Sequence, residues 1–476
     1  MSTIVKSNAY ADVLSRKNEI MKSAIGIDYS VFESGSIAFD YERMMSEAGY
    51  GLEEIQKIQS QTGVGNTPLF ELRNLTKLAR TFSKPGYGGR ILVKDEAGNP
   101  SGSFKARRAA TAVYHAKKLG YQGVIAATSG NYGAAVASQA AMQGLKCIIV
   151  QECYDSRMVG QPEILEKQRA CEAYGAEVIQ LSVGPELFYT FLLLLEQTGY
   201  FNASLYTPFG IAGVETLGYE LAHQCKTTLG KFPEQVIVTH AGGGNVTGTA
   251  RGLTKAGATD TKVVAASVDL TGLHMASDTA FNKKSFTTGH TGFGIPFATQ
   301  PDRADVPRNA ARPLRYMDRY VTVKQGEVFY ITEALAILEG LERGPAGNTS
   351  LTAAFAIAQE MKEDEILVVQ ETEYTGAGKH PLAQLTFARE NGVEIVFGNP
   401  DNEVAGTSII LPETPQQIKA RDFDLNKARR SYIKNALTPY ADKVITNEDV
   451  QFLLDDSRAE HTTVNELLTE LRISVK

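Results

Sequence analysis

A lysine stands where a predicted strand turns into a predicted helix, in the stretch KDEAGNPSGSFKARRAA (residues 94–110). Pro100 prevents the helix from starting earlier, a tight turn follows at 101–103, and Lys105 opens an alanine-rich helix. Because the amino terminus of a helix carries a partial positive charge, it disfavours a protonated amine. Lys105 is therefore a candidate nucleophile of the kind that forms Schiff bases, and a solvated surface lysine is the alternative.

A second candidate site lies in the stretch AATSGNYGAAVASQAA, residues 126–141. An apolar run leads into Thr128, Ser129, Gly130 and Asn131, and a helix of small residues follows. Hydroxyl and backbone N–H groups at such a strand-to-helix turn bind anions, and here they suit a carboxylate. The alternative is purely structural, because Asn131 is also a good helix N-cap.

Three consecutive glycines mark a third candidate site, within VIVTHAGGGNVTGTARGL (236–253). Gly242, Gly243 and Gly244 follow an apolar strand, and Asn245 lies at the start of the next helix. Glycines let backbone N–H groups approach an oxyanion closely, and the positive end of the helix dipole favours its charge. The spacing matches neither GxGxxG nor a Walker loop. The turn predicts a phosphate cradle, with a generic tight turn as the alternative.

A fourth group of polar residues follows a predicted strand, in VVQETEYTGAGKH (368–380). Glu371 and Thr375 lie at or just beyond the end of this strand. Polar groups at the carboxyl end of a parallel strand point into the crevice where ligands bind. The four groups together predict an amine, a carboxylate cradle, a phosphate cradle and a polar strand end at one site.

The elements that must position these groups alternate between short apolar runs and longer helical patterns. The stretches 104–119 and 133–143, for example, place apolar residues at i, i+3 and i+4. The predicted strands are 91–94, 124–127, 147–151, 178–181, 236–239, 263–268, 366–369 and 394–397. This rhythm predicts an α/β fold with two doubly wound, mostly parallel sheets.

The chain of 476 residues is long enough for several domains. The strand–helix rhythm is lost over 271–318, which is rich in Gly, Pro, Arg and Lys and is longer than an ordinary connection. The predicted parts are a helical N-terminal extension (1–60), a large domain (61–104 with 229–400, including the insert 271–318), a small α/β domain (105–228) and a charged helical C-terminal extension (401–476).

Composition narrows the function classes. The chain has 48 basic and 54 acidic side chains and a net charge of −6, which argues against a nucleic-acid-binding protein. The only cysteines are Cys147, Cys153, Cys171 and Cys225, and none form a CxxC pair, so we expect free thiols in a cytoplasmic protein. No apolar run reaches the roughly 20 residues that a membrane helix needs, and no secretory signal is visible.

These motifs, and their order along the chain, resemble those of the fold-type II pyridoxal-phosphate (PLP) enzymes. This group includes threonine synthase, cysteine synthase and the tryptophan synthase β subunit. The resemblance spans residues 60–395. It is carried by GNTPL (65–69), PSGSFK (100–105), TSGNYG (128–133), GGGN (242–245) and TGAGK (375–379). It implies PLP as the cofactor, a tryptophan synthase β-like fold and no metal ion.

Stretches outside the shared motifs resemble one family within that group, the PLP-binding β subunits of 2-amino-4-oxopentanoate thiolases. These stretches include IGIDYSVFESGSIAFDYERMM, FTTGHTGFGIPFAT and RADVPRNAARPLRYMDRYVTV. The resemblance implies cleavage of 2-amino-4-oxopentanoate with coenzyme A to alanine, the D isomer, and acetyl-CoA in ornithine degradation. It also implies a small α subunit as partner and a homodimer of this chain. The alternative is a β/γ-elimination or replacement enzyme similar to threonine synthase or diaminopropionate ammonia-lyase.

The resemblance assigns a role to each motif. Lys105 would hold the cofactor as a Schiff base, and Asn131 would contact the 3′-oxygen of the pyridine ring. Thr375 would meet the pyridine nitrogen, and Glu371 remains an alternative for that place. The residues that would hold the substrate carboxylate are Thr128, Ser129 and Gly130. The residues that would hold the phosphate are Gly242, Gly243, Gly244 and Asn245.

The predicted insert also carries several basic residues, among them Arg308, Arg312 and Arg315. These side chains could meet the phosphates of coenzyme A or the partner subunit. The alternative is ordinary solvated loop charge.

Overall fold

A seven-stranded sheet forms the larger layer of the computed structural model, which describes residues 6–47, 50–128, 130–271, 280–286, 294–303, 305–374 and 381–476. Its strand order is β1-β2-β10-β7-β8-β9-β13. The strands are β1 (Leu69–Glu71), β2 (Arg90–Asp95), β7 (Gln235–Thr239), β8 (Lys262–Val268), β9 (Arg319–Val323), β10 (Ile366–Glu371) and β13 (Arg421–Asp422). The strands from β2 to β9 are parallel, whereas the edge strands β1 and β13 are antiparallel to their neighbours.

A second, four-stranded parallel sheet has the order β5-β4-β3-β6. Its strands are β3 (Gly123–Thr128), β4 (Lys146–Tyr154), β5 (Glu177–Ser182) and β6 (Phe201–Asn202). Every residue of β3 is buried, as expected for a central parallel strand with both faces covered. Two further strand pairs are β11 (Glu394–Gly398) with β12 (Ser408–Pro412) and β14 (Val444–Ile445) with β15 (Ser474–Val475).

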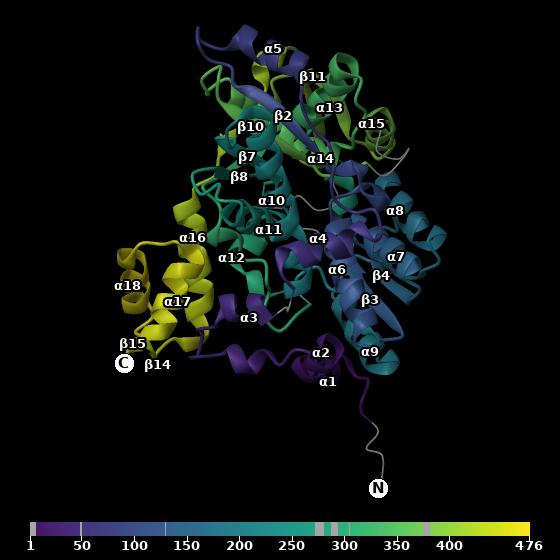
Figure 1. Cartoon of the computed structure of the whole chain (residues 1–476), viewed down its shortest axis with the longest axis vertical. Coiled ribbons are helices and arrows are strands. Elements are labelled where there is room, and N and C mark those ends of the chain that lie inside the picture. The colour runs from purple at the N-terminus through teal and green to yellow at the C-terminus, as the bar shows by residue number, and fades with distance from the viewer. Residues whose placement is uncertain are drawn as a thin grey trace.

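Helices cover both sheets (Figure 1). In the large sheet, α14 contacts β7, β8 and β10, while α11 contacts β7 and β8; in the small sheet, α7 and α9 contact β3 and β4. The helices are α1 (Tyr10–Ser15), α2 (Lys17–Ile25), α3 (Tyr41–Glu47), α4 (Leu52–Ser60), α5 (Arg73–Phe82), α6 (Lys105–Lys118), α7 (Asn131–Gln143), α8 (Pro162–Ala173), α9 (Glu186–Thr198), α10 (Pro208–Leu229), α11 (Gly244–Lys255), α12 (Gly294–Thr299), α13 (Gln325–Glu339), α14 (Pro345–Ala358), α15 (Pro381–Glu390), α16 (Leu425–Leu437), α17 (Asn447–Ser457) and α18 (His461–Glu470).

Glycines let α10 and α11 approach each other closely. A Cβ atom at Gly252 would lie 2.0 Å from the carbonyl oxygen of Glu215, and one at Gly218 would lie 2.1 Å from that of Thr249. No side chain fits at either position without moving backbone. Because α10 follows the small sheet and α11 opens after β7, this contact fixes the segment that carries the small sheet against the large one.

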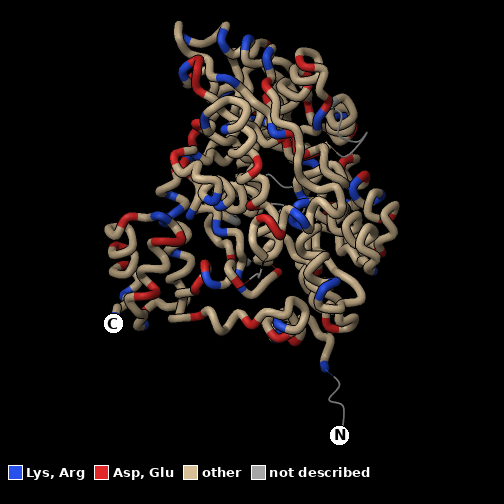
Figure 2. The backbone as a smooth tube through the Cα atoms, viewed as in Figure 1, with Lys and Arg blue, Asp and Glu red and all other residues tan. Residues whose placement is uncertain are grey.

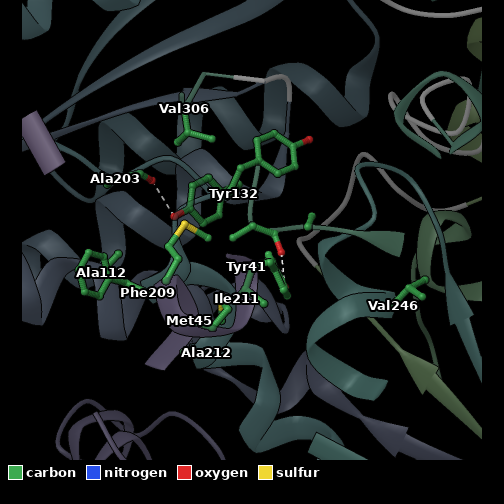
Figure 3. Packing of buried hydrophobic residues seen from close by; sticks show 14 of the residues in the cluster. Tyr41, Met45, Ala112, Tyr132, Ala203, Phe209, Ile211, Ala212, Val246 and Val306 are labelled. Carbon is green, nitrogen blue, oxygen red and sulfur yellow. Dashed lines mark hydrogen bonds between the residues drawn. The ribbon is translucent and has the colours of Figure 1, made fainter. Parts of the chain in front are cut away.

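The hydrophobic core continues into the N-terminal helices. Figure 3 shows Tyr41 and Met45 of α3 close to Tyr132 of α7 and to Phe209 and Ile211 of α10. The hydroxyl of Tyr132 donates a hydrogen bond to the carbonyl of Ala203 at 2.7 Å. A buried hydroxyl satisfied in this way belongs to the core, so Tyr132 has a structural role.

The structure confirms the predicted fold class, and each predicted strand is present, as β2, β3, β4, β5, β7, β8, β10 and β11. It adds strands that the pattern missed, including β9 and β12, and β13 brings part of the predicted C-terminal extension into the large sheet. The division into domains stays a prediction.

All four cysteines are free and buried. Burial raises the pKa of Cys153, Cys171 and Cys225 to about 12, and it raises that of Cys147 further. These thiols therefore remain protonated and unreactive in the folded protein.

Basic and acidic residues are intermixed along the described backbone (Figure 2). Across the part of the chain that the structure describes, no helix combines the length and apolar character required to cross a bilayer. Within the same residues no group of histidine, cysteine and carboxylate side chains is arranged to hold a metal ion.

Candidate active site

Lys105 is the first residue of α6, and the start of this helix is attached to the chain that leaves β10. The backbone N–H of Phe104 donates to the carbonyl of Thr372 at 3.1 Å, and that of Tyr374 donates to the carbonyl of Gly102 at 2.8 Å. Just before the helix Ser101 has a φ of 62°, which bends the turn sharply. These contacts place Lys105 beside the carboxyl end of the sheet, as its predicted role requires.

The helix that carries Lys105 also lies against the glycine turn. Lys105 Nζ is 4.7 Å from the ring centroid of Phe104, and the guanidinium of Arg108 lies over the same ring at 5.2 Å. A Cβ atom at Gly244 would be only 2.6 Å from Nη2 of Arg108. Arg108 lies one helical turn after Lys105 on the same helix and contacts the triple-glycine turn at Gly244, so the lysine and the glycine turn belong to one region.

The glycine turn itself has the geometry of an anion cradle. Gly243 has a φ of 84°, a conformation that L side chains rarely adopt, and Gly244 is the first residue of α11. A Cβ atom at Gly242 would lie 2.2 Å from the Tyr206 hydroxyl, so the turn is tightly enclosed. The adjoining Asn245 is 5% exposed, and its Nδ2 has no hydrogen-bond partner in the part of the chain that the structure describes. The unpaired N–H groups of a helix start and this amide all favour an oxyanion.

The second predicted cluster forms the turn between β3 and α7. Thr128 Oγ1 accepts hydrogen bonds from the N–H groups of Gly130 at 3.0 Å and Gly133 at 3.3 Å. Asn131, the first residue of α7, is 2% exposed, and neither its Oδ1 nor its Nδ2 has a partner among the described residues. The helix α7 also contacts the turn at Pro100–Gly102, which directly precedes Phe104 and Lys105. Ser129 falls outside the described residues.

The polar strand end is only partly described. Thr375 and the rest of TGAGK lie outside the described residues, so the predicted contact with the pyridine nitrogen stays a prediction. Glu371, the last residue of β10, is fully buried, and a Cβ atom at Gly347 would lie 1.7 Å from its Oε1. Burial lowers the pKa of Arg343, but its pair with Asp95 and, to a smaller extent, the charge of Glu371 raise that pKa above its ordinary value. Glu371 therefore belongs to a buried charged group at this strand end.

Unsatisfied polar atoms test whether the site fits PLP. Buried polar atoms in proteins normally have partners, and an exception needs an explanation. Within the described residues, the buried side-chain atoms without a partner at these turns and at the end of β10 include Ser101 Oγ, Ser103 Oγ, Asn131 Oδ1 and Nδ2, Asn245 Nδ2, Arg108 Nε and Gln370 Oε1. Together with the glycine turn, this set suits a ligand that carries a phosphate, a hydroxyl and a ring nitrogen. The residues present fit PLP.

The basic residues of the predicted insert are occupied within the chain. Arg312 pairs with Asp302 at 2.6 Å and also with Asp456, while Arg308 pairs with Asp302 at 3.3 Å. Arg315 reaches Asp456 at 3.6 Å and Glu42 at 3.8 Å. The interpretation of these three arginines as contacts for coenzyme A is therefore not favoured, because each already has carboxylate partners.

Two residues of this region were not singled out from the sequence. Arg107 and Arg108 are adjacent residues of the same type, so the sequence does not show which of them faces the glycine turn. Gln370 donates from Nε2 to Thr249 Oγ1 at 2.7 Å, which connects the end of β10 to α11. The sequence feature that could have indicated Gln370 is its position near the end of a predicted strand.

Comparison with known proteins agrees with this geometry. The family model "Pyridoxal-phosphate dependent enzyme" matches residues 60–371. A 2-amino-4-ketopentanoate thiolase beta subunit from Acetoanaerobium sticklandii is 71% identical over 467 residues, which cover 98% of this chain and 99% of that protein. A second protein of the same description, from an unknown prokaryotic organism, is 65% identical over 99% of this chain and its own full length.

Solved structures share the fold. A threonine deaminase superposes with a TM-score of 0.52 at 24% identity, covering 69% of this chain and 99% of that one. Cysteine synthase from Entamoeba histolytica gives 0.51 at 20% identity, covering 70% and 95%. The chain therefore belongs to the family of pyridoxal-phosphate dependent enzymes, and within it to the 2-amino-4-ketopentanoate thiolase beta subunits.

Proposed function

We propose that this chain is the PLP-binding subunit of an enzyme that converts 2-amino-4-oxopentanoate and coenzyme A into alanine and acetyl-CoA. Oxopentanoate and ketopentanoate are two names for the same compound. The observation that carries the proposal is 71% identity over nearly the whole chain to a thiolase beta subunit. The position of Lys105 on the helix that lies against the glycine turn also supports it, because a PLP-binding subunit needs an amine and a phosphate cradle at one site.

The reaction balances without an oxidant or reductant. The C3–C4 bond of the substrate breaks, the thiol sulfur of coenzyme A bonds to C4, and the thiol proton ends on C3, which becomes the methyl group of alanine. Bound PLP supplies the electron sink that spreads the negative charge generated beside the amino group. The protein must therefore hold the amino acid in one orientation and move protons at the α and β carbons.

The described residues can do both. In the proposal, the Lys105 amine attaches the cofactor and, when released, takes and returns the α proton. The turn at Thr128 and Gly130 holds the substrate carboxylate, together with Ser129. Asn131 fixes the ring through its 3′-oxygen, and either Thr375 or Glu371 meets the ring nitrogen. The residues proposed to hold the phosphate are Gly242, Gly243, Gly244 and Asn245.

The proposal includes a partner, because the relatives are described as beta subunits. We infer a small α subunit, a homodimer of this chain and a coenzyme A site that the α subunit helps to form. We also infer a place in ornithine degradation and in the cytoplasm, where free cysteines such as these persist. The elimination or replacement alternative has less support, since a threonine synthase from Halalkalibacterium halodurans is 32% identical over only 39% of this chain.

The decisive experiment measures acetyl-CoA formation from 2-amino-4-oxopentanoate and coenzyme A, with and without the co-expressed α subunit. We expect product only with both chains, in a one-to-one ratio with alanine. O-phosphohomoserine and diaminopropionate serve as competing substrates in the same assay. Turnover of either of these, with no acetyl-CoA from the complex, would replace the proposal by the elimination or replacement alternative.

A further inference from the structure

Arg108 is a buried cation for which the described residues provide no counter-charge. Its side chain is 4% exposed, Nε has no hydrogen-bond partner, and no carboxylate of the described part of the chain pairs with it. Its neighbour Arg107 is equally buried but binds Glu96 at 2.7 Å and Glu220 at 3.1 Å. A buried guanidinium without an anion is costly, and a bound anionic ligand is one way to supply the missing charge.

The surroundings of Arg108 indicate where that anion lies. The position that a Cβ atom of Gly244 would take is 2.6 Å from Nη2, 2.9 Å from Nη1 and 2.9 Å from Cζ of Arg108. The guanidinium therefore lies directly against Gly244, the first residue of α11, where the N–H groups that open the helix lack helical partners. Burial lowers the pKa of Arg108 to about 10, although Tyr132 and Tyr206 nearby oppose this shift. The guanidinium stays charged at neutral pH, and a bound anion would offset the cost of burying that charge.

We propose that Arg108 is a binding residue for the phosphate of PLP and that it completes the cradle formed by residues 242–245. This inference rests on the proposed function. A phosphate monoester carries a charge of about −1.5 to −2 at neutral pH. The helix start offers about +0.5, so the glycine turn alone leaves most of that charge unbalanced. The guanidinium supplies one further unit, and its planar fork matches phosphate oxygens.

A carboxylate is the competing anion, and charge and position argue against it. The substrate carboxylate already has the turn at Thr128 and Gly130, on α7 rather than α11. A carboxylate also carries only one negative charge, so a helix start of about +0.5 leaves about half a charge unbalanced, against about 1 to 1.5 charges for a phosphate monoester. Arg108 is needed where the charge is larger, at the glycine turn.

The test compares PLP with pyridoxal, which lacks the phosphate, on the apoenzyme. We expect Arg108→Met to weaken PLP binding by about 10- to 100-fold, the range for hydrogen bonds to a charged group, and to change pyridoxal binding by less than about 3-fold. Arg108→Lys keeps the charge and should recover part of the loss. Arg73→Met, at an exposed position on α5, is the control and should leave both affinities unchanged. Absorbance titration gives each dissociation constant.

A second readout uses inorganic phosphate alone. Phosphate should raise the Tm of the wild-type apoenzyme, because a ligand that binds only the folded state stabilises it, and should do so much less in Arg108→Met. If Arg108→Met does not fold, Arg108→Lys takes its place, with a smaller loss in the same direction expected. Equal losses of affinity for PLP and pyridoxal in Arg108→Met would overturn the inference. So would a variant that keeps its preference for PLP but binds alanine more weakly, because Arg108 would then bind the carboxylate.

The two proposals fail differently. If the wild-type apoenzyme binds PLP no better than pyridoxal, the phosphate cradle and the proposed function are wrong. If the wild type prefers PLP strongly and Arg108→Met keeps that full preference, only the role of Arg108 is wrong.

Discussion

Lys105→Ala is expected to abolish turnover, by more than about a thousand-fold, because no other amine replaces a covalent anchor and proton carrier. The purified variant should also lose the Schiff-base absorbance near the visible edge. Borohydride reduction provides a direct measurement. It should attach pyridoxyl mass to the peptide that contains Lys105 in the wild type and to no peptide in the variant.

Lys117→Ala is the matched control, since Lys117 is exposed on the same helix α6. We expect it to keep wild-type absorbance, labelling and turnover. An unchanged spectrum in Lys105→Ala, or labelling at another lysine in the wild type, would show that the nucleophile has been assigned to the wrong residue.

Arg107→Met should produce the largest loss of stability, about 3–5 kcal/mol, because it leaves buried carboxylates without their partner. Arg107 is fully buried and donates to both carboxylate oxygens of Glu96, to Glu220 and to Thr216. Urea denaturation followed by circular dichroism measures the change. Arg43→Met removes an exposed pair with Glu47 and should cost less than about 1 kcal/mol. Comparable losses for the two variants would contradict this account.

The same network predicts a pH dependence. Burial raises the pKa of Glu220, but Arg107 and Lys94 lower it more, so that it falls to about 2 from an ordinary value of 4.5. A group with a lowered pKa contributes stability above its unfolded pKa and loses it as the pH falls through the folded value. The stability difference between the wild type and Arg107→Met should therefore be largest above pH 4.5 and should shrink between pH 4.5 and about 2.

The central strands could be predicted because burial on both faces requires continuous apolar runs, as in β3 and β10. β13 has only two residues, and its neighbours decide its conformation. β12 is longer, but it lies in a stretch whose composition is polar. β9 lies directly after the irregular insert, where no preceding helix marks its start. Pairing of such strands depends on tertiary contacts that a local pattern does not contain.

The site shows the same limit at the level of single residues. The glycines and Lys105 stand out because turn chemistry restricts the residue types that fit. Arg107 and Arg108 are adjacent in sequence, but successive residues of a helix point about 100° apart. One side chain therefore meets Glu96, and the other meets Gly244. Which arginine has which role follows only from the packing of α6 against α11 and the chain around Glu96.

The buried cysteines have a practical consequence for an enzyme proposed to use a thiol substrate. Disulfide exchange requires a thiolate, and burial keeps Cys153, Cys171 and Cys225 protonated at neutral pH. The native chain should therefore form no mixed disulfide with oxidised coenzyme A. A chromogenic thiol reagent added to samples withdrawn from the reaction should therefore report the coenzyme A that remains, without a background from this chain.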